Sequence, residues 1–78
     1  MKITGRQIRM ARIALKWRVD DLANESGIQW ARVQQMERSD DFLPENEKLV
    51  KIIKTFENNK ISFINDDDIF QPYIKLKK

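Results

Sequence analysis

Side chains suited to recognising another molecule gather in residues 29–38, Gln-Trp-Ala-Arg-Val-Gln-Gln-Met-Glu-Arg. A glutamine amide can form a bidentate pair with adenine, and an arginine guanidinium can form one with guanine. Each such pair is worth roughly 1–3 kcal/mol of discrimination against the wrong base. The segment is therefore a candidate for reading the bases of DNA, although ordinary polar surface residues would give the same composition.

The spacing of apolar residues within 29–38 indicates which of these side chains face outward. In a helix, Val33 and Met36 share the buried side, whereas Ala31 and Gln35 lie opposite them. Trp30 falls at the border of the apolar side. Three roles stay open for it: a core residue, a contact to DNA, or a contact to another protein.

Two short helices separated by Gly27 are expected to position this face. The first runs over about 19–26 and buries Leu22 and Ala23. Gly27 suits the left-handed conformation that ends a helix, and the second helix runs over about 29–38. This is the layout of a helix-turn-helix, which presents its second helix to the major groove of DNA.

A further helix is expected on each side of this pair. Thr4-Gly5-Arg6-Gln7 has the Thr-x-x-Gln form of a capping box, so the first helix begins there and ends near Lys16. Trp17 is expected to close the core over the C-terminus of that helix. The last helix is expected over about 45–58, with Glu45-Asn46-Glu47 as its acidic first turn. Its apolar stripe consists of Leu49, Ile52, Ile53 and Phe56.

The last part of the chain changes to a pattern typical of strands. Ile61–Ile64 predicts one strand, 65–68 a turn, and Ile69–Leu76 a returning strand that Pro72 shortens or restricts to an edge. We therefore expect a mainly α fold: a bundle of four to five short helices followed by a short C-terminal β-hairpin or strand. Residues 1–58 form the predicted helix-turn-helix domain, and 59–78 form a β tail that packs on the bundle or on a dimer partner.

The composition argues against several kinds of chemistry. The chain has 78 residues, enough for one small domain, and contains neither cysteine nor histidine. Disulfides and thiolate metal sites are therefore excluded, and imidazole catalysis and zinc sites lose their usual residues. Asp66-Asp67-Asp68 is read as a solvated turn rather than a metal site, because adjacent acids in a strand-like turn point to different sides. We expect no catalytic residue, no metal site and no cofactor.

Positive charge lies in the same half of the chain as the predicted helix-turn-helix. The net charge is +3, from 15 Lys and Arg against 12 Asp and Glu. Residues 1–38 carry a net charge of +4, and residues 39–78 carry −1. Such an asymmetry suits a polyanionic partner, although a solvated charged surface would also produce it.

From Ile3 to about Phe56 the chain resembles the lambda-repressor-like helix-turn-helix family, also called the Cro/repressor or XRE type. The matching residues are Arg9, Arg12, Trp17, Leu22-Ala23, Gly27-Ile28, Val33, Met36-Glu37-Arg38, Leu49 and Ile52. The resemblance implies a charge-assisted pair between Arg12 and Glu37 that would hold the first helix to the third. The alternative is that both side chains are exposed, with Arg12 on a phosphate.

The resemblance also implies which residues contact DNA. Members of the family read bases from the first turn and the middle of the third helix, and nearby cations contact phosphates. The implied DNA-binding residues are Arg18, Gln29, Trp30, Ala31, Arg32, Gln34, Gln35 and Arg38. The chain departs from the family pattern at Val19, at Ser39, and at Arg18, which stands at the usual serine N-cap and cannot cap but could reach a phosphate. It also departs at Asp40 and Asp41, which would repel phosphates unless they point away.

These features predict a sequence-specific DNA-binding transcriptional regulator, a repressor type that binds a palindromic operator as a homodimer. The alternative is an antitoxin or accessory protein–protein interaction module that uses the same fold, with a toxin or another protein as partner. No apolar run is long enough to span a bilayer, and Met1-Lys2-Ile3-Thr4 does not open a signal peptide. We therefore expect a cytoplasmic protein of bacterial or phage type, located at the nucleoid when bound to DNA and without a membrane partner.

Overall fold

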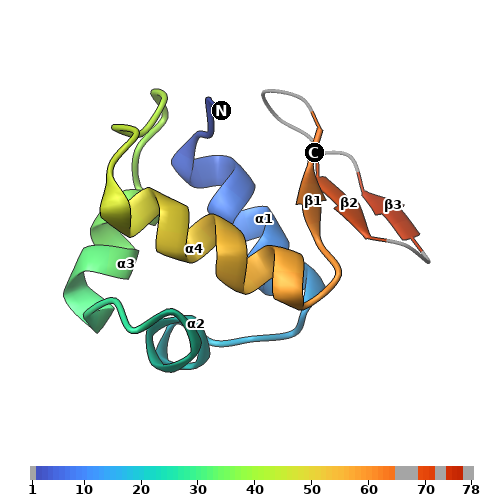
Figure 1. Ribbon diagram of the computed structural model, residues 1–78, viewed down its shortest axis with the longest axis horizontal. Helices are drawn as coiled ribbons and strands as arrows, with labels where there is room; N and C mark the ends of the chain where they lie inside the picture. Colours follow the sequence, from blue (N-terminus) through green and yellow to red (C-terminus); the bar gives the residue numbers. More distant parts are fainter. Residues whose placement is uncertain (1, 65–68, 72–73, 77–78) are drawn as a thin grey trace.

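Four helices precede three short strands in the computed structural model, which describes residues 2–64, 69–71 and 74–76. The elements are α1 (Gly5–Ala14), α2 (Val19–Ser26), α3 (Trp30–Glu37), α4 (Glu47–Asn58), β1 (Ser62–Phe63), β2 (Ile69–Gln71) and β3 (Ile74–Leu76). Figure 1 shows α4 crossing in front of α1, with α3 on one side of the bundle and the strands on the other. The predicted fold class, a small and mainly helical bundle, is confirmed.

The capping box predicted at the start of α1 is present. The Thr4 hydroxyl accepts a hydrogen bond from the Gln7 N–H at 3.3 Å, and the Gln7 side chain accepts one from the Thr4 N–H at 3.0 Å. Both residues are buried. The helix ends at Ala14, close to the expected position, and Lys16 follows with φ 60° in the left-handed region.

The helices α3 and α4 are shorter than the sequence predicted, because residues expected at their ends are caps outside the helix. Asn46 is the N-cap of α4, and its side-chain oxygen accepts from the N–H groups of Lys48 and Leu49 at 3.1 and 3.2 Å. The helix was predicted to begin at about Glu45; it begins at Glu47, two residues later, since Glu45 precedes the cap. In α3, Gln29 and Arg38 are the flanking caps, so the helix is one residue shorter at each end than expected.

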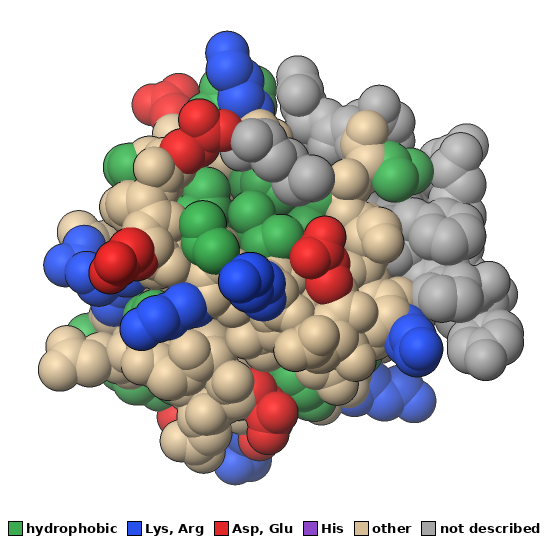
Figure 2. Space-filling model, in the orientation of Figure 1, with side chains coloured by type: hydrophobic (Ala, Val, Ile, Leu, Met, Phe, Trp, Pro, Cys, Tyr) green, Lys and Arg blue, Asp and Glu red, His purple; other side chains and the backbone are tan. Residues whose placement is uncertain are grey.

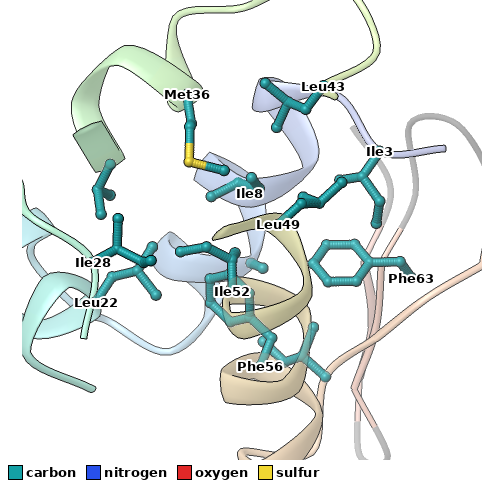
Figure 3. Close-up of a cluster of buried hydrophobic side chains, with 13 residues drawn as sticks. Ile3, Ile8, Leu22, Ile28, Met36, Leu43, Leu49, Ile52, Phe56 and Phe63 are labelled. Atoms are coloured by element: carbon teal, nitrogen blue, oxygen red, sulfur yellow. The ribbon is translucent and has the colours of Figure 1, made fainter. Parts of the chain in front are cut away.

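The core lies between the four helices and β1, where apolar side chains converge (Figure 3). An aromatic row runs through it. The Trp17 and Phe56 rings stack with centroids 6.2 Å apart, and the Phe63 ring meets Phe56 edge-on at 5.8 Å. Trp17 thus closes the core after α1, as predicted, and Phe63 joins β1 to the bundle.

The strands form one antiparallel sheet in the order β1-β2-β3. The prediction of a single returning strand over 69–76 is wrong, because β2 and β3 within that range pair with each other. A strand that meets Pro72 cannot continue its ladder of N–H donors. Ile61 and Phe63 are buried, so the tail packs on its own bundle at this point. The turn predicted at 65–68 lies outside the described residues.

Candidate nucleic-acid interface

The α2–α3 pair is joined by a turn of three residues, 27–29. Gly27 has φ 74°, and its N–H donates to the Ala23 carbonyl at 2.9 Å. A β-carbon on Gly27 would meet open space, so the backbone conformation rather than crowding favours glycine here. Figure 1 shows α2 nearly end-on and α3 from the side, so the two helices cross steeply. This arrangement is that of a helix-turn-helix.

The two sides of α3 differ as the sequence predicts. Val33 and Met36 are buried in the core. Ala31, Arg32 and Gln35 are exposed on the other side. The structure therefore leaves amide, guanidinium, indole and methyl groups exposed around the outward side of α3. We call this set the α3 outer row and define it as Gln29, Trp30, Ala31, Arg32 and Gln35.

Trp30 belongs to this row and not to the core. Its side chain is 47% exposed, whereas Ile28, two residues earlier, is 6% exposed. The core role left open by the sequence is therefore wrong, because the half-exposed indole lies outside the buried core cluster. Trp30 and Gln29 instead border a shallow hollow between α2 and α3. Its other lining residues are Asp20, Ala23, Asn24, Gly27 and Ile28.

An ion pair joins the C-terminal end of α3 to α1. The Arg12 Nε lies 2.7 Å from Glu37 Oε2, and Arg12 Nη2 lies 3.0 Å from Glu37 Oε1, which makes the pair bidentate. Arg12 Nη1 also donates to the Trp17 carbonyl at 2.9 Å. The two charged side chains are only 15% and 8% exposed. The pair implied by the resemblance is thus present. The hydrogen bonds of the Arg12 guanidinium are made to Glu37 and Trp17 of the same chain.

A second attachment joins the same end of α3 to the start of α1, and the sequence reading missed it. A β-carbon on Gly5 would overlap the carbonyl oxygens of Met36 and Ser39, so the two backbones approach closely here. The Gly5 N–H donates to the Ser39 carbonyl at 3.1 Å. The Leu43 N–H donates to the Ile3 carbonyl at 2.7 Å. The sequence offers one indication of this close approach: Gly5 stands in the first turn of a helix, although glycine lowers helix stability.

The predicted residues at the other end of α3 lie apart from the outer row. Gln34 is half-buried, and Gln34 and Arg38 border a second hollow next to the ion pair. Arg9 and Asp40 line the same hollow. Sequence reading did not assign Arg9 to the interface, although it stands one helical turn before Arg12 and so faces the same side. The carboxylate of Asp40 offsets part of the positive charge there.

The start of α2 carries the last predicted contact. Arg18 is exposed as the N-cap residue, and its backbone N–H donates to the Asp21 side chain at 2.8 Å. Its side chain makes no capping hydrogen bond. Val19, beside it, is half-buried against the core and also reaches the second hollow. The guanidinium of Arg18 is therefore placed to meet a group outside the protein.

The face that carries α4 has a different character. Figure 2 shows apolar side chains near its centre with charges of both signs around them. Val50 on α4 is 48% exposed. Positive side chains do not form a continuous surface on this face (Figure 2).

The described residues contain neither a metal-binding cluster nor a membrane-spanning helix. No group of three or more Asp, Glu, His or Cys side chains gathers there in a way that could hold a metal ion. No helix in that part of the chain is long and apolar enough to cross a membrane. The triplet Asp66-Asp67-Asp68 lies outside the described residues.

Comparisons of the chain with protein-family models, with curated proteins and with solved structures found no match. Any assignment to a family therefore rests on the residues of this chain and on their arrangement.

Proposed function

We propose that the chain is a sequence-specific DNA-binding transcriptional regulator of the lambda-repressor-like helix-turn-helix type. It binds a palindromic operator as a homodimer, with α3 of each copy in the major groove. The observation that carries the proposal is the outward-facing row on α3, which exposes Arg32 and Gln35 while Val33 and Met36 hold the helix in the core. A regulator of this type works in the bacterial cytoplasm, at the nucleoid.

Each part of the interface has its own task in this proposal. Gln35 and Arg32 pair with base edges and so select the sequence. Arg18 and Arg38 contact phosphates, which fixes the protein on the duplex without reading it. The part-buried pair of Arg12 and Glu37 keeps α3 in the orientation that these contacts require.

Gln35→Ala tests the proposal on a duplex that the wild-type protein has selected from a random-sequence library. Fluorescence anisotropy should show weaker binding and a relaxed preference at one base pair of each half-site, because the amide that reads it is gone. Asn58→Ala is the matched control, since Asn58 is an exposed amide at the end of α4 remote from α3 (Figure 1). Unchanged affinity and base preference in Gln35→Ala would reject the recognition role of α3.

The alternative is an antitoxin or accessory module whose partner is a protein. The exposed indole of Trp30 favours it, because exposed tryptophan is enriched at protein interfaces. The exposed acids Asp40 and Asp41 would also suit a basic partner better than DNA. Failure to bind any duplex at low salt, together with a protein that co-purifies in fixed stoichiometry, would support this alternative over DNA binding.

A further inference from the structure

The first turn of α3 exposes apolar surface where a helix-turn-helix places residues against base edges. Trp30 and Ala31 are the first two residues of the helix, and both are exposed. The ring contacts of the described residues involve other side chains: Trp17, Phe56, Phe63 and Phe42. The core therefore does not need the Trp30 indole, and its exposed face is available to a partner.

The chemistry of these two side chains limits what they can recognise on DNA. The indole of Trp30 has one N–H donor and no acceptor, and Ala31 has neither. Neither residue can form the bidentate pairs that Gln and Arg make with purines. The apolar group that a base presents in the major groove is the C5-methyl of thymine.

The residues beside Trp30 also favour a contact to a base over a contact to the sugar–phosphate backbone. Asp20 lines the hollow beside Trp30, and its carboxylate would repel a phosphate brought against the indole. The sugar–phosphate backbone is therefore a poor partner for this part of the row. Gln29, also in the hollow and exposed, can pair with the adenine opposite or next to a thymine.

We infer that Trp30, together with Ala31, reads thymine C5-methyl groups in the operator half-site. This inference rests on the proposed DNA-binding function. It makes the first turn of α3 a methyl reader, while Arg32 and Gln35 supply the hydrogen-bonding contacts further along the helix.

Deoxyuridine substitution tests this inference, because it removes the C5-methyl and leaves the base pair unchanged. The full chain first selects a duplex from a random-sequence library. Each thymine of the selected half-site is then replaced singly by deoxyuridine, and affinity is measured by fluorescence anisotropy at one salt concentration. Wild-type binding should fall about four-fold at a thymine under the first turn, the effect of losing one buried methyl group.

The variant Trp30→Ala should bind the thymine and deoxyuridine duplexes equally at that position. Trp30→Phe should retain part of the methyl effect, because it keeps an aromatic face. Val50→Ala is the matched control: Val50 is 48% exposed on α4, and its loss should leave both affinities unchanged. Thermal unfolding followed by circular dichroism verifies that each variant is folded.

Two results would overturn the inference while leaving the proposed function intact: wild-type protein that is indifferent to deoxyuridine at every position, or Trp30→Ala that keeps the full methyl effect. Wild-type protein that selects no sequence and binds no duplex would instead overturn the proposed function, and this inference with it. DNA affinity unaltered by Trp30→Ala would reject the role of the indole as a methyl reader.

Discussion

The two ends of α3 differ sharply in how they are attached. At the C-terminal end, Glu37 forms a bidentate pair with Arg12, and the backbone lies directly against Gly5. At the N-terminal end, Gln29 caps the helix without a side-chain hydrogen bond, and Trp30 is 47% exposed. One end of the helix is fastened to the bundle, and the other end projects side chains that the fold does not use.

This difference suggests how a small domain can carry a precise recognition surface. Residues that contact a partner must be held in one orientation, yet their own side chains must stay free. In the proposed function, the attachments at one end of α3 and the contacts on its first turn and outer row would meet both needs. Substitutions at the two ends should therefore separate stability from binding.

Arg12→Ala should have the largest effect on stability. It leaves the Glu37 carboxylate, which is 8% exposed, without its ion-pair partner. Loss of one partner of a fully buried pair costs about 3–5 kcal/mol. Because this pair is part-buried, that range is an upper bound, and the variant should be clearly less stable in urea denaturation. Arg32→Ala is the control, because it removes an exposed guanidinium from the same molecule.

A double variant, Arg12→Met with Glu37→Leu, should recover much of the lost stability, since no unpaired charge remains. If Arg12→Ala were no more destabilising than Arg32→Ala, the fastened end of α3 would not depend on this ion pair.

Gly5→Ala should have the next largest effect on the free energy of unfolding, and the sign of the change shows whether α1 and α3 are in close contact. Helix propensity alone would make this change stabilising by roughly 0.5–1 kcal/mol. The added β-carbon would instead overlap the Met36 and Ser39 carbonyls, and such overpacking costs about 1–3 kcal/mol. Thermal unfolding measures the change, and a rise in melting temperature would show that α1 and α3 are not in close contact at Gly5.

Arg32→Ala, on the outer row, should change the free energy of unfolding by no more than about 0.5 kcal/mol. Its effect should appear in binding: a lost guanidinium–guanine pair weakens affinity for the selected duplex by about five- to 150-fold. Chemical denaturation and anisotropy on the same preparation separate the two quantities. If Arg32→Ala lowered the free energy of unfolding as much as the free energy of DNA binding, the two ends of α3 would not be functionally distinct.

Asp40→Asn should have the smallest effect, and it should strengthen DNA binding, whereas Arg32→Ala weakens it. Asp40 shares the second hollow with Arg9 and Arg38, where it opposes their attraction for phosphates. Removing its charge should tighten DNA binding by about two- to five-fold at low salt, the range of exposed charge interactions. The gain should shrink as salt is added, and weaker binding at low salt would show that Asp40 contacts the partner favourably.

Features set by local chain geometry could be predicted from the sequence. The capping box at Thr4 and Gln7 and the left-handed Gly27 each depend on a few neighbouring residues, and both were found as expected. The buried side of α3 follows from the spacing of Val33 and Met36. The pairing of Arg12 with Glu37 came from the family resemblance, because nothing local relates two residues 25 positions apart.

Features set by packing between distant segments were missed or left open. The close approach at Gly5 depends on where α3 ends relative to α1, which periodicity does not give. Trp30 lies at the border of the apolar side, so periodicity left its burial open, and the structure shows it 47% exposed. Pro72 indicated that the expected strand 69–76 is shortened, but the antiparallel pairing of β2 with β3 within that range was not predicted.

The central claim, that α3 is a DNA-recognition helix used by a dimer, is tested most directly by one selection experiment. The purified full chain is incubated with a random-sequence duplex library, and the mass of the bound complex in solution is measured alongside. The account predicts enrichment of a palindrome whose half-sites lie one helical turn apart, bound by two copies of the chain. Recovery of no preferred sequence at low salt would contradict it.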